Sequence, residues 1–346
     1  MKIGAVTSAL PTQQVSNDDV IELIRQHSTQ FDGDLDETLH QVRFWLGLSG
    51  SSHRRWSGTA ERPIDLLCAA GRESLDTAGV AADSIDLVIY TGVGRGFIEP
   101  GGAYHAAAAL GIQRAQCFDV LDACMSWTRA VQITEGLFQS GAASTALLVN
   151  AEFNLRADGY VNPRVFALTS PEAVSWSFPA FTLGEAATAT VLVKDEQPGW
   201  DFMFASRPDL ADLCNVPLPG YDGFCSPSDK IARNGTGHFT SFGAELHSNG
   251  QPEALAVFKR LDVDVDDVDI LFTHASSKRW WDDRASEVGL GHAIHHVYPH
   301  TGNVVSASVP AAMADAVAQG RMQRGDRGTV WVGSAGMSFA AFTFTF

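Results

Sequence analysis

The sequence is short of positive charge. Its 346 residues include 24 lysines and arginines against 40 aspartates and glutamates, which gives a formal net charge of −16 at pH 7. Nucleic acids and anionic membrane surfaces attract positively charged proteins, so this excess of acidic residues argues against either as a general partner. The sequence also lacks any run of roughly 18 consecutive apolar residues, the length that a membrane-spanning helix needs. We therefore expect no nucleic-acid partner and no membrane partner.

Cysteines are few and show no pairing pattern. Their odd number and irregular spacing argue against a disulfide framework. The first residues, MKIGAVTSALP, lack the long apolar segment and the small-residue cleavage site of a signal peptide. These absences favour a reducing compartment, and we expect a cytoplasmic location. The five cysteines are Cys68, Cys117, Cys124, Cys214 and Cys225.

The chain contains an internal repeat. Residues 83–92, DSIDLVIYTG, are similar to residues 266–275, DDVDILFTHA. Residues 139–149, QSGAASTALLV, are similar to residues 323–333, QRGDRGTVWVG, with Thr145 aligned to Thr329. Both pairs are separated by nearly the same number of residues, which predicts two copies of one architecture. The predicted copies span residues 1–190 and 195–346.

Each predicted copy alternates strands with helices. The runs LVIYTGV and ILFTHAS are short and apolar, as expected of buried strands, and the helical patterns that follow end near Gly141 and Gly325. This order predicts an α/β fold in which mainly parallel sheets are covered by helices. Two such halves with their central helices packed together would form a five-layered α/β/α/β/α body. Residues 154–182 and 200–250 resemble long loops, which often carry function.

Cys124 lies between a predicted strand and a predicted amphipathic helix, in CFDVLDACMSWTRAVQ. A helix N-terminus favours the thiolate, and a thiolate is a competent nucleophile toward a thioester. The alternative is a buried cysteine that acts only as a small hydrophobic residue, as most free cysteines do. Cys68 and Cys117 fit that alternative, and the spacing of Cys214 and Cys225 suits no standard zinc site.

His274 ends a predicted strand of the second copy, and reactive groups in α/β sheets gather at the carboxyl ends of strands. Ser276 and Ser277 follow it, a setting that suits acid–base or hydrogen-bonding chemistry, although a purely structural histidine fits equally well. Asn303, in HTGNVVSASVPAAM, precedes the next predicted helix. A turn and helix cap would explain this asparagine without any catalytic role.

Four histidines cluster near Asn303 without a carboxylate or cysteine at ligand spacing, so no metal site is predicted there. The final segment, VWVGSAGMSFAAFTF, combines a strand, a glycine-containing turn and a last strand. Backbone N–H groups at such a turn can form an oxyanion hole, the set of donors that stabilises negative charge on a carbonyl oxygen. The four histidines are His292, His295, His296 and His300.

Taken in order, five segments of the sequence resemble the β-ketoacyl-acyl-carrier-protein synthase III family of the thiolase superfamily. The resemblance runs along nearly the whole chain, and the internal duplication is what the thiolase fold of this family implies. The segments are IGAVTSALPTQQVSNDDV, PGGAYHAAAALGIQRAQCFDVLDAC, FTHASSKR, HTGNVVSASVPAAM and VGSAGMSFAAF.

The resemblance implies a ping-pong condensing enzyme. Cys124 corresponds to the family nucleophile, which takes the acyl group from a thioester of coenzyme A or acyl carrier protein. The backbone N–H groups of Cys124 and Ala335 correspond to the oxyanion hole. His274 and Asn303 would hydrogen-bond the second thioester as it becomes an enolate, and the new carbon–carbon bond forms to a malonyl or β-ketoacyl group. No cofactor is implied beyond these thioester substrates.

The resemblance also suggests substrate-binding residues. Trp45 and Arg156 lie near the positions where the family holds the adenine of coenzyme A. Ser277 replaces an asparagine that lies close to the pantetheine arm. Arg279 remains in a segment where the family often carries lysines that dock the carrier protein, but acidic residues interrupt the segment here.

These departures favour specialised lipid or polyketide metabolism over bulk fatty-acid synthesis. A homodimer is expected through the region Pro100–His105. One alternative is an acyltransferase that passes the acyl group of Cys124 to an oxygen or nitrogen nucleophile. Another is a non-catalytic partner subunit. The presence of Asn303 favours condensation, because that reaction needs a pair of groups to stabilise an enolate.

Overall fold

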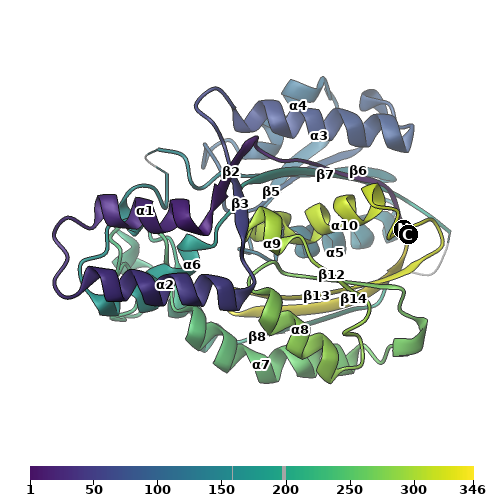
Figure 1. Ribbon diagram of the computed structural model, residues 1–346. Coiled ribbons are helices and arrows are strands. Elements are labelled where there is room, and N and C mark those ends of the chain that lie inside the picture. The colour runs from purple at the N-terminus through teal and green to yellow at the C-terminus, as the bar shows by residue number, and fades with distance from the viewer. Residues whose placement is uncertain (158, 197–199) are drawn as a thin grey trace.

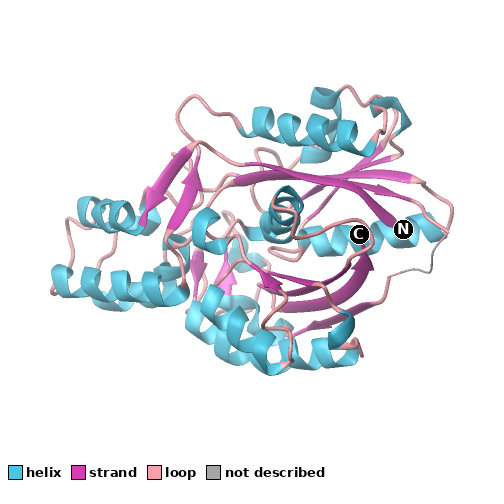
Figure 2. Ribbon diagram, turned by 45° about the vertical axis from the view of Figure 1, so that its right-hand side comes forward, coloured by secondary structure: helices cyan, strands magenta, loops and turns pink. Residues whose placement is uncertain are grey.

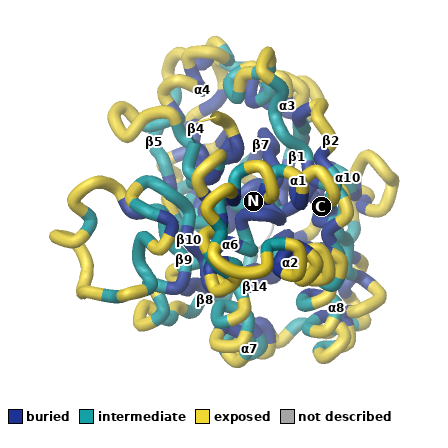
Figure 3. The backbone as a smooth tube through the Cα atoms, turned by 60° about the vertical axis from the view of Figure 1, so that its left-hand side comes forward, coloured by how far each residue is buried: buried dark blue, intermediate teal, exposed yellow. Residues whose placement is uncertain are grey.

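Two five-stranded sheets lie one above the other, with helices between them and on their outer faces (Figures 1 and 2). The computed structural model describes residues 1–157, 159–196 and 200–346. Buried residues follow the strands and the central helices, whereas exposed residues follow the outer helices and long loops (Figure 3). In these described ranges, no helix is long and apolar enough to cross a membrane.

The first sheet belongs to the N-terminal half. Its strand β4 is buried along its whole length and pairs in parallel with the edge strand β5 and the central strand β6. Strand β7 runs antiparallel to β6 and β1, and helices α3 (Pro63–Ala78) and α4 (Gly102–Leu110) cover the outer face (Figure 1). The spatial order is β1 (Lys2–Ala9), β7 (Ala186–Val193), β6 (Thr145–Glu152), β4 (Leu87–Thr91) and β5 (Gln116–Val120).

The second sheet has the same topology. Strand β11 pairs in parallel with β12 and β13, and β14 runs antiparallel to β13 and β8. Helices α7 (Gly243–Arg260) and α8 (Lys278–Glu287) cover its outer face (Figure 1). The equivalent spatial order is β8 (Phe202–Ser206), β14 (Ser338–Thr345), β13 (Arg327–Ser334), β11 (Ile270–Thr273) and β12 (Ile294–His295). The predicted duplicated five-layered fold is therefore confirmed.

The hydrogen bonds at the strand ends correct one detail of the repeat. The carboxylate of Asp86 accepts a bond from the N–H of Thr145 at 3.1 Å, and that of Asp269 accepts one from the N–H of Arg327 at 2.8 Å. Thr145 is thus equivalent to Arg327, and its alignment with Thr329 was wrong by two residues. The limits 1–190 and 195–346 stay a prediction.

The central layer consists of α5 (Ser126–Gln139) and α10 (Ser308–Ala318), which lie between the two sheets (Figure 1). Helix α10 is buried on almost every side, and its apolar residues join the same core as those of α5 and both sheets. Alanines on α10 leave room for the sheets to approach closely. Because both central helices are enclosed, the residues just before them are held rigidly at the junction of the halves.

A smaller layer covers one end of the sheets, at the left of Figure 1. It contains the predicted excursion 154–182, which includes a helix that the sequence did not predict, α6, and the middle part of the predicted excursion 200–250. The expectation that all of 200–250 is loop was wrong, because its first residues form β8 of the second sheet and its last residues begin α7. The elements of this smaller layer are β2 (Gln13–Ser16), α1 (Asn17–His27), α2 (Leu35–Ser49), β3 (His53–Trp56), α6 (Val174–Phe181), β9 (Cys214–Asn215), β10 (Thr240–Ser241) and α9 (Tyr298–Thr301).

Candidate active site

A cavity of about 740 Å³ lies where the two halves and the smaller layer meet. Most of its wall is apolar, contributed by α6, α7 and the loops around them. Arg156 is exposed and is not among the lining residues; it lies near the buried carboxylate of Glu185. The lining residues that the sequence singled out are Trp45, Cys124, His274, Ser277, Arg279, Asn303 and Ala335.

A sharp turn between β5 and α5 holds Cys124. Ala123 adopts a positive φ of 45°, which is strained for a residue with a side chain. The hydroxyl of Ser126 donates to the carbonyl oxygen of Ala123 at 2.7 Å and accepts from the N–H of Asp122 at 2.9 Å. Cys124 therefore stands two residues before the first residue of α5, as predicted, and faces the second half.

Ser334 of the second half completes this turn from the other side of the cavity. Its hydroxyl accepts from the N–H of Met125 at 3.2 Å and donates to the carbonyl oxygen of Asp122 at 3.4 Å. The N–H of Ala335 hydrogen-bonds the sulfur of Cys124, and the Ser334 hydroxyl can do so when its single proton turns away from Asp122. The turn predicted to supply an oxyanion donor thus lies directly against the thiol.

The sequence-based expectation of a favoured thiolate was wrong. Burial raises the pKa of the Cys124 thiol well above its ordinary value, and Cys214 and Glu152 raise it further. The hydrogen bonds from Ser334 and Ala335 lower the pKa only partly. Desolvation in the apolar cavity outweighs the local effect of the helix terminus, so the resting group is the neutral thiol.

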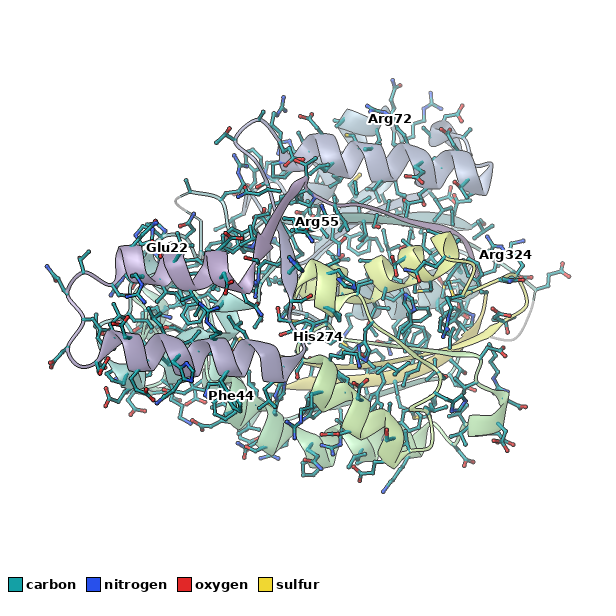
Figure 4. All side chains as sticks on the ribbon, in the orientation of Figure 1. Glu22, Phe44, Arg55, Arg72, His274 and Arg324 are labelled. Carbon is teal, nitrogen blue, oxygen red and sulfur yellow. The ribbon has the colours of Figure 1, made fainter. Side chains whose placement is uncertain are left out.

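His274 follows β11 and is buried near the centre of the molecule (Figure 4). Its Nδ1 atom lies 3.1 Å from the hydroxyl of Ser308, which donates to the carbonyl oxygen of Val305 at 2.7 Å. Because that hydroxyl proton is engaged, Nδ1 carries the ring proton and Nε2 is left as the acceptor. Burial lowers the pKa of His274 to about 3, with a further contribution from His247, so the imidazole is neutral.

Backbone hydrogen bonds to a neighbouring loop fix Asn303. Its N–H donates to the carbonyl oxygen of Thr182 at 2.8 Å, and its carbonyl oxygen accepts from the N–H of Gly184 at 2.9 Å. Its side-chain oxygen accepts from the N–H of Val305 at 2.9 Å, which is the turn that the sequence left as an alternative. Among the residues that the structure describes, none accepts a hydrogen bond from the carboxamide Nδ2 of Asn303, which leaves this donor open. A side chain at Gly184 is impossible, since its Cβ would lie 1.8 Å from the carbonyl oxygen of Thr301.

Glu152, at the end of β6, is a buried carboxylate that the sequence analysis missed. It accepts from the N–H of Gly94 at 2.7 Å and from the hydroxyl of Ser306 at 2.6 Å, so it joins the two halves beneath the site. The sequence signal that could have revealed Glu152 is an acidic residue at the end of an otherwise apolar strand. His247 and Cys214 also line the cavity and were missed, because the segment 200–250 shows no periodic pattern.

The outer part of the cavity is formed by α2 and α8. Trp45 on α2 is 48% exposed, and Arg279 on α8 is also exposed. Ser277 caps α8: its hydroxyl accepts from the N–H of Trp280 at 3.3 Å and donates to the carbonyl oxygen of Ser49 at 3.4 Å. The binding roles predicted for these residues stay predictions.

The histidine cluster makes contacts with carboxylates. His295 bonds Asp315 at 2.8 Å, and His296 bonds Asp282 at 2.7 Å. Within the part of the chain that the structure describes, no three histidine, cysteine or acidic side chains are gathered as a metal site.

Two sequence-family models match the chain. The model described as 3-oxoacyl-[acyl-carrier-protein] synthase III matches residues 118–207, and the model of the C-terminal part of the same enzymes matches residues 258–346. The first match contains Cys124, and the second contains His274, Asn303 and Ala335. Together they cover about half of the chain.

Curated relatives align over most of their length. A β-ketoacyl-[acyl-carrier-protein] synthase III of Rhizorhabdus wittichii is 28% identical over 327 residues, which are 92% of this chain and 91% of the relative. One of Rhodospirillum centenum is 28% identical over 284 residues, 80% of this chain and 82% of the relative.

Solved structures share the fold. A cysteine-to-serine variant of OleA from Xanthomonas campestris, with bound lauric acid and lauroyl-CoA, superposes with a TM-score of 0.82 at 19% identity, covering 99% of this chain and 98% of that one. 3-Oxoacyl-[acyl-carrier-protein] synthase III from Aquifex aeolicus has a TM-score of 0.77 at 18% identity, covering 100% and 99%. With the two family matches, these findings assign the chain to the β-ketoacyl-acyl-carrier-protein synthase III-like family of the thiolase superfamily.

Proposed function

We propose that the protein condenses two acyl thioesters through an acyl group carried on Cys124. The observation that carries this proposal is the meeting of four groups at one cavity: the thiol of Cys124, the N–H of Ala335, Nε2 of His274 and Nδ2 of Asn303. They come from distant parts of the sequence. The hydrogen bonds of His274 and Asn303 leave Nε2 and Nδ2 open, and the N–H of Ala335 bonds the resting sulfur, beside which the carbonyl oxygen of a bound acyl group would lie.

In the first half-reaction, the Cys124 sulfur attacks the carbonyl carbon of a donor thioester, and a new carbon–sulfur bond forms. Because the resting thiol is neutral, its proton must leave during the attack, and Nε2 of neutral His274 is the acceptor that the site offers. The negative charge on the carbonyl oxygen is stabilised by the N–H of Ala335. The donor carbon–sulfur bond then breaks, and the departing thiolate takes the proton.

In the second half-reaction, the carbonyl oxygen of a second thioester becomes an enolate oxygen. Nδ2 of Asn303 donates to this oxygen, and His274 donates beside it once Nε2 carries the proton. That tautomer requires the Ser308 hydroxyl to rotate from the Val305 carbonyl toward Nδ1. With a malonyl thioester, the enolate forms as the carbon–carbon bond to the carboxylate breaks, carbon dioxide leaves, and the electron pair of that bond stays on the thioester. The enolate carbon attacks the acyl carbon on Cys124 and a carbon–carbon bond forms. The carbon–sulfur bond to Cys124 then breaks, and the thiolate that leaves takes a proton from solvent.

The alternative function transfers the acyl group to an oxygen or nitrogen nucleophile. It needs no enolate, so the open carboxamide donor of Asn303 would have no partner in that reaction. This donor favours condensation, with a malonyl or β-ketoacyl thioester as the second substrate.

The cavity supports an apolar acyl group, since helix α6 supplies Val174 and Phe178 to its wall. The OleA structure with bound lauric acid and lauroyl-CoA makes acyl chains of that kind the first to test. On α8, Lys278 pairs with Asp282 at 2.5 Å and Arg284 pairs with Glu287 at 3.1 Å. These pairs weaken α8 as a dock for an acidic carrier protein and support a coenzyme A thioester as donor, in specialised metabolism.

We also propose a cytoplasmic homodimer. Around Pro100–His105, three large apolar side chains are exposed: Phe97 at 52%, Ile98 at 77% and Tyr104 at 54%. Such a patch is typical of an interface. Light scattering coupled to gel filtration should give twice the mass of one chain, and a single-chain mass would contradict the proposal.

The function is tested with lauroyl-CoA and malonyl-CoA. Intact mass spectrometry should show one lauroyl adduct in the parent protein and none in Cys124→Ala. Addition of malonyl-CoA should discharge the adduct with release of one carbon dioxide per product. Discharge by an amine or alcohol with no carbon dioxide from any malonyl donor would support the acyltransferase. No adduct with any acyl thioester would support the non-catalytic subunit.

A further inference from the structure

A second imidazole faces the cavity and has no part in the mechanism above. His247 lies on α7, and its ring stacks on Trp280 of α8 with centroids 5.0 Å apart and planes 17° apart. Trp280 in turn meets Trp281 edge-on, with centroids 4.7 Å apart. Two helices of the second half therefore fix the orientation of the His247 ring.

The polar atoms of this ring are unused by the protein. Among the residues that the structure describes, none makes a hydrogen bond with the His247 imidazole. Burial lowers the pKa of His247 to about 4, so the ring is neutral and offers one N–H donor and one nitrogen acceptor. An open donor and acceptor in an apolar cavity are unfavourable unless a ligand satisfies them.

The position of His247 connects the two ends of the cavity. On one side its stacking partner Trp280 directly follows Arg279, which is exposed on α8. On the other side His247 contributes to the lowered pKa of His274, so the two imidazoles are close. Cys124, His247 and Arg279 line the same cavity, so a thioester that runs from Cys124 to the α8 side lies in one cavity with this ring.

A second polar residue, Ser277, lines the same cavity as His247. Its hydroxyl caps α8 through Trp280 and donates to Ser49, so its only proton is engaged. A serine used in this way has no donor left for a bound arm. His247 is the neighbouring group that combines a donor with an acceptor.

We propose that His247 binds an amide group of the arm that carries the acyl thioester. The neutral ring matches an amide in both senses: its N–H donates to the amide oxygen, and its bare nitrogen accepts from the amide N–H. The arm shared by coenzyme A and acyl carrier protein contains two such amides. This inference rests on the proposed use of acyl thioesters and adds the residue that recognises their arm.

The test measures binding alone, in a Cys124→Ala background that cannot be acylated. His247→Phe keeps an aromatic ring for the stack on Trp280 but removes both hydrogen bonds, whereas His247→Gln keeps a donor and an acceptor. His292→Phe, at an exposed histidine outside the cavity, is the matched control. Calorimetry then gives the Kd of each variant for lauroyl-CoA and for lauric acid, which has no arm.

We expect His247→Phe to raise the Kd for lauroyl-CoA about two- to tenfold, the range of one or two hydrogen bonds. His247→Gln should recover part of this loss, His292→Phe should have no effect, and the Kd for lauric acid should not change. An unchanged Kd for lauroyl-CoA in His247→Phe, an equal loss for lauric acid, or no binding of lauroyl-CoA at all would overturn the inference. The lauroyl adduct on Cys124 is measured separately in the parent protein, so a failure of the proposed reaction is distinguishable.

Discussion

In the first half of the molecule strand β4 ends in Thr91, and His274 stands at the corresponding point of the second half, directly after β11. The hydroxyl of Thr91 donates to Val149 of its own sheet at 3.4 Å, whereas His274 turns into the cavity and bonds Ser308. Both side chains are buried at matching points of the same topology. Thr91 therefore stabilises its own sheet, whereas His274 is placed to take part in the reaction.

The segments that precede the two central helices differ in the same way. The turn before α5 presents Cys124, and the loop before α10 presents Asn303, while the first residue of α10, Ser308, supports His274. The duplicated scaffold places both segments at one junction, and the residues at the strand and helix ends decide what each contributes. The first half supplies the nucleophile, and the second supplies the groups that stabilise charge and move protons.

The largest expected effect is loss of the nucleophile. Cys124→Ala should abolish the acyl adduct and lower product formation by roughly a thousandfold or more, because the acyl group is carried on this sulfur in both half-reactions. Cys117→Ala, at a half-buried cysteine on β5, is the control and should keep the adduct. Intact mass and product assays check this. An undiminished adduct in Cys124→Ala would place the acyl chain elsewhere.

The next largest effect distinguishes the catalytic contributions of the two halves. His274→Ala and Asn303→Ala should each lower condensation by about 10²- to 10³-fold, because each removes a group that stabilises the enolate. Thr91→Ala, the matched change in the first half, should leave the rate within about twofold and affect only stability. Steady-state kinetics with malonyl-CoA measure all three. Equal losses of condensation rate in Thr91→Ala and His274→Ala would contradict the proposal that only the second-half residue takes part in the reaction.

A smaller effect concerns the support of His274. Ser308→Ala leaves Nδ1 of a buried imidazole without a partner, and we expect about a tenfold lower rate in both half-reactions. Ser308→Thr, which keeps a hydroxyl, should restore most of the rate. Single-turnover acylation and discharge are measured separately. If Ser308→Ala matches the parent in both steps, the proposed change of tautomer is wrong.

The smallest effect is on stability against acid. Folded His274 and His247 have pKa values lowered to about 3 and 4, while unfolded histidines titrate near the ordinary value of 6.5. As pH falls below 6.5, the unfolded chain gains protons that the folded chain does not, so this contribution to stability is lost. Each histidine should cost about 2 kcal/mol at pH 5.

Urea unfolding at pH 7 and pH 5 measures this loss. The variant His247→Phe should lose less stability between the two pH values than the parent does, because it has one buried histidine fewer. The same change at exposed His292 should leave the pH dependence as it is in the parent. An identical pH dependence of stability in His247→Phe and the parent would contradict the lowered pKa assigned to His247.

Much of the fold could be predicted because the duplication repeats both the apolar strands and the residues that precede them. The apolar strands around Ile89 and Phe272 are short, buried runs in both halves, and Asp86 and Asp269 precede them with the same hydrogen bonds to the next strand. Helix α6 was missed, because its eight residues contain Pro179 and are held by packing against neighbouring aromatic rings more than by their own propensity.

The site was predictable only in part. Cys124, His274 and Asn303 lie in segments with family resemblance, and the structure brings all three to one cavity. The raised pKa of the Cys124 thiol could not be predicted, since burial depends on how the second half closes over the turn. His247 could not be predicted either, because its role depends on a stacking partner on another helix.

The most direct test follows the acyl group through both half-reactions in one sample. Peptide mass mapping after lauroyl-CoA should locate one lauroyl group on Cys124 in the parent and in the His274→Ala, Asn303→Ala double variant after long incubation. Malonyl-CoA should then discharge it rapidly from the parent but leave it on the double variant. Equally fast discharge from both proteins, or an adduct on any other residue, would contradict the division of chemistry between the two halves.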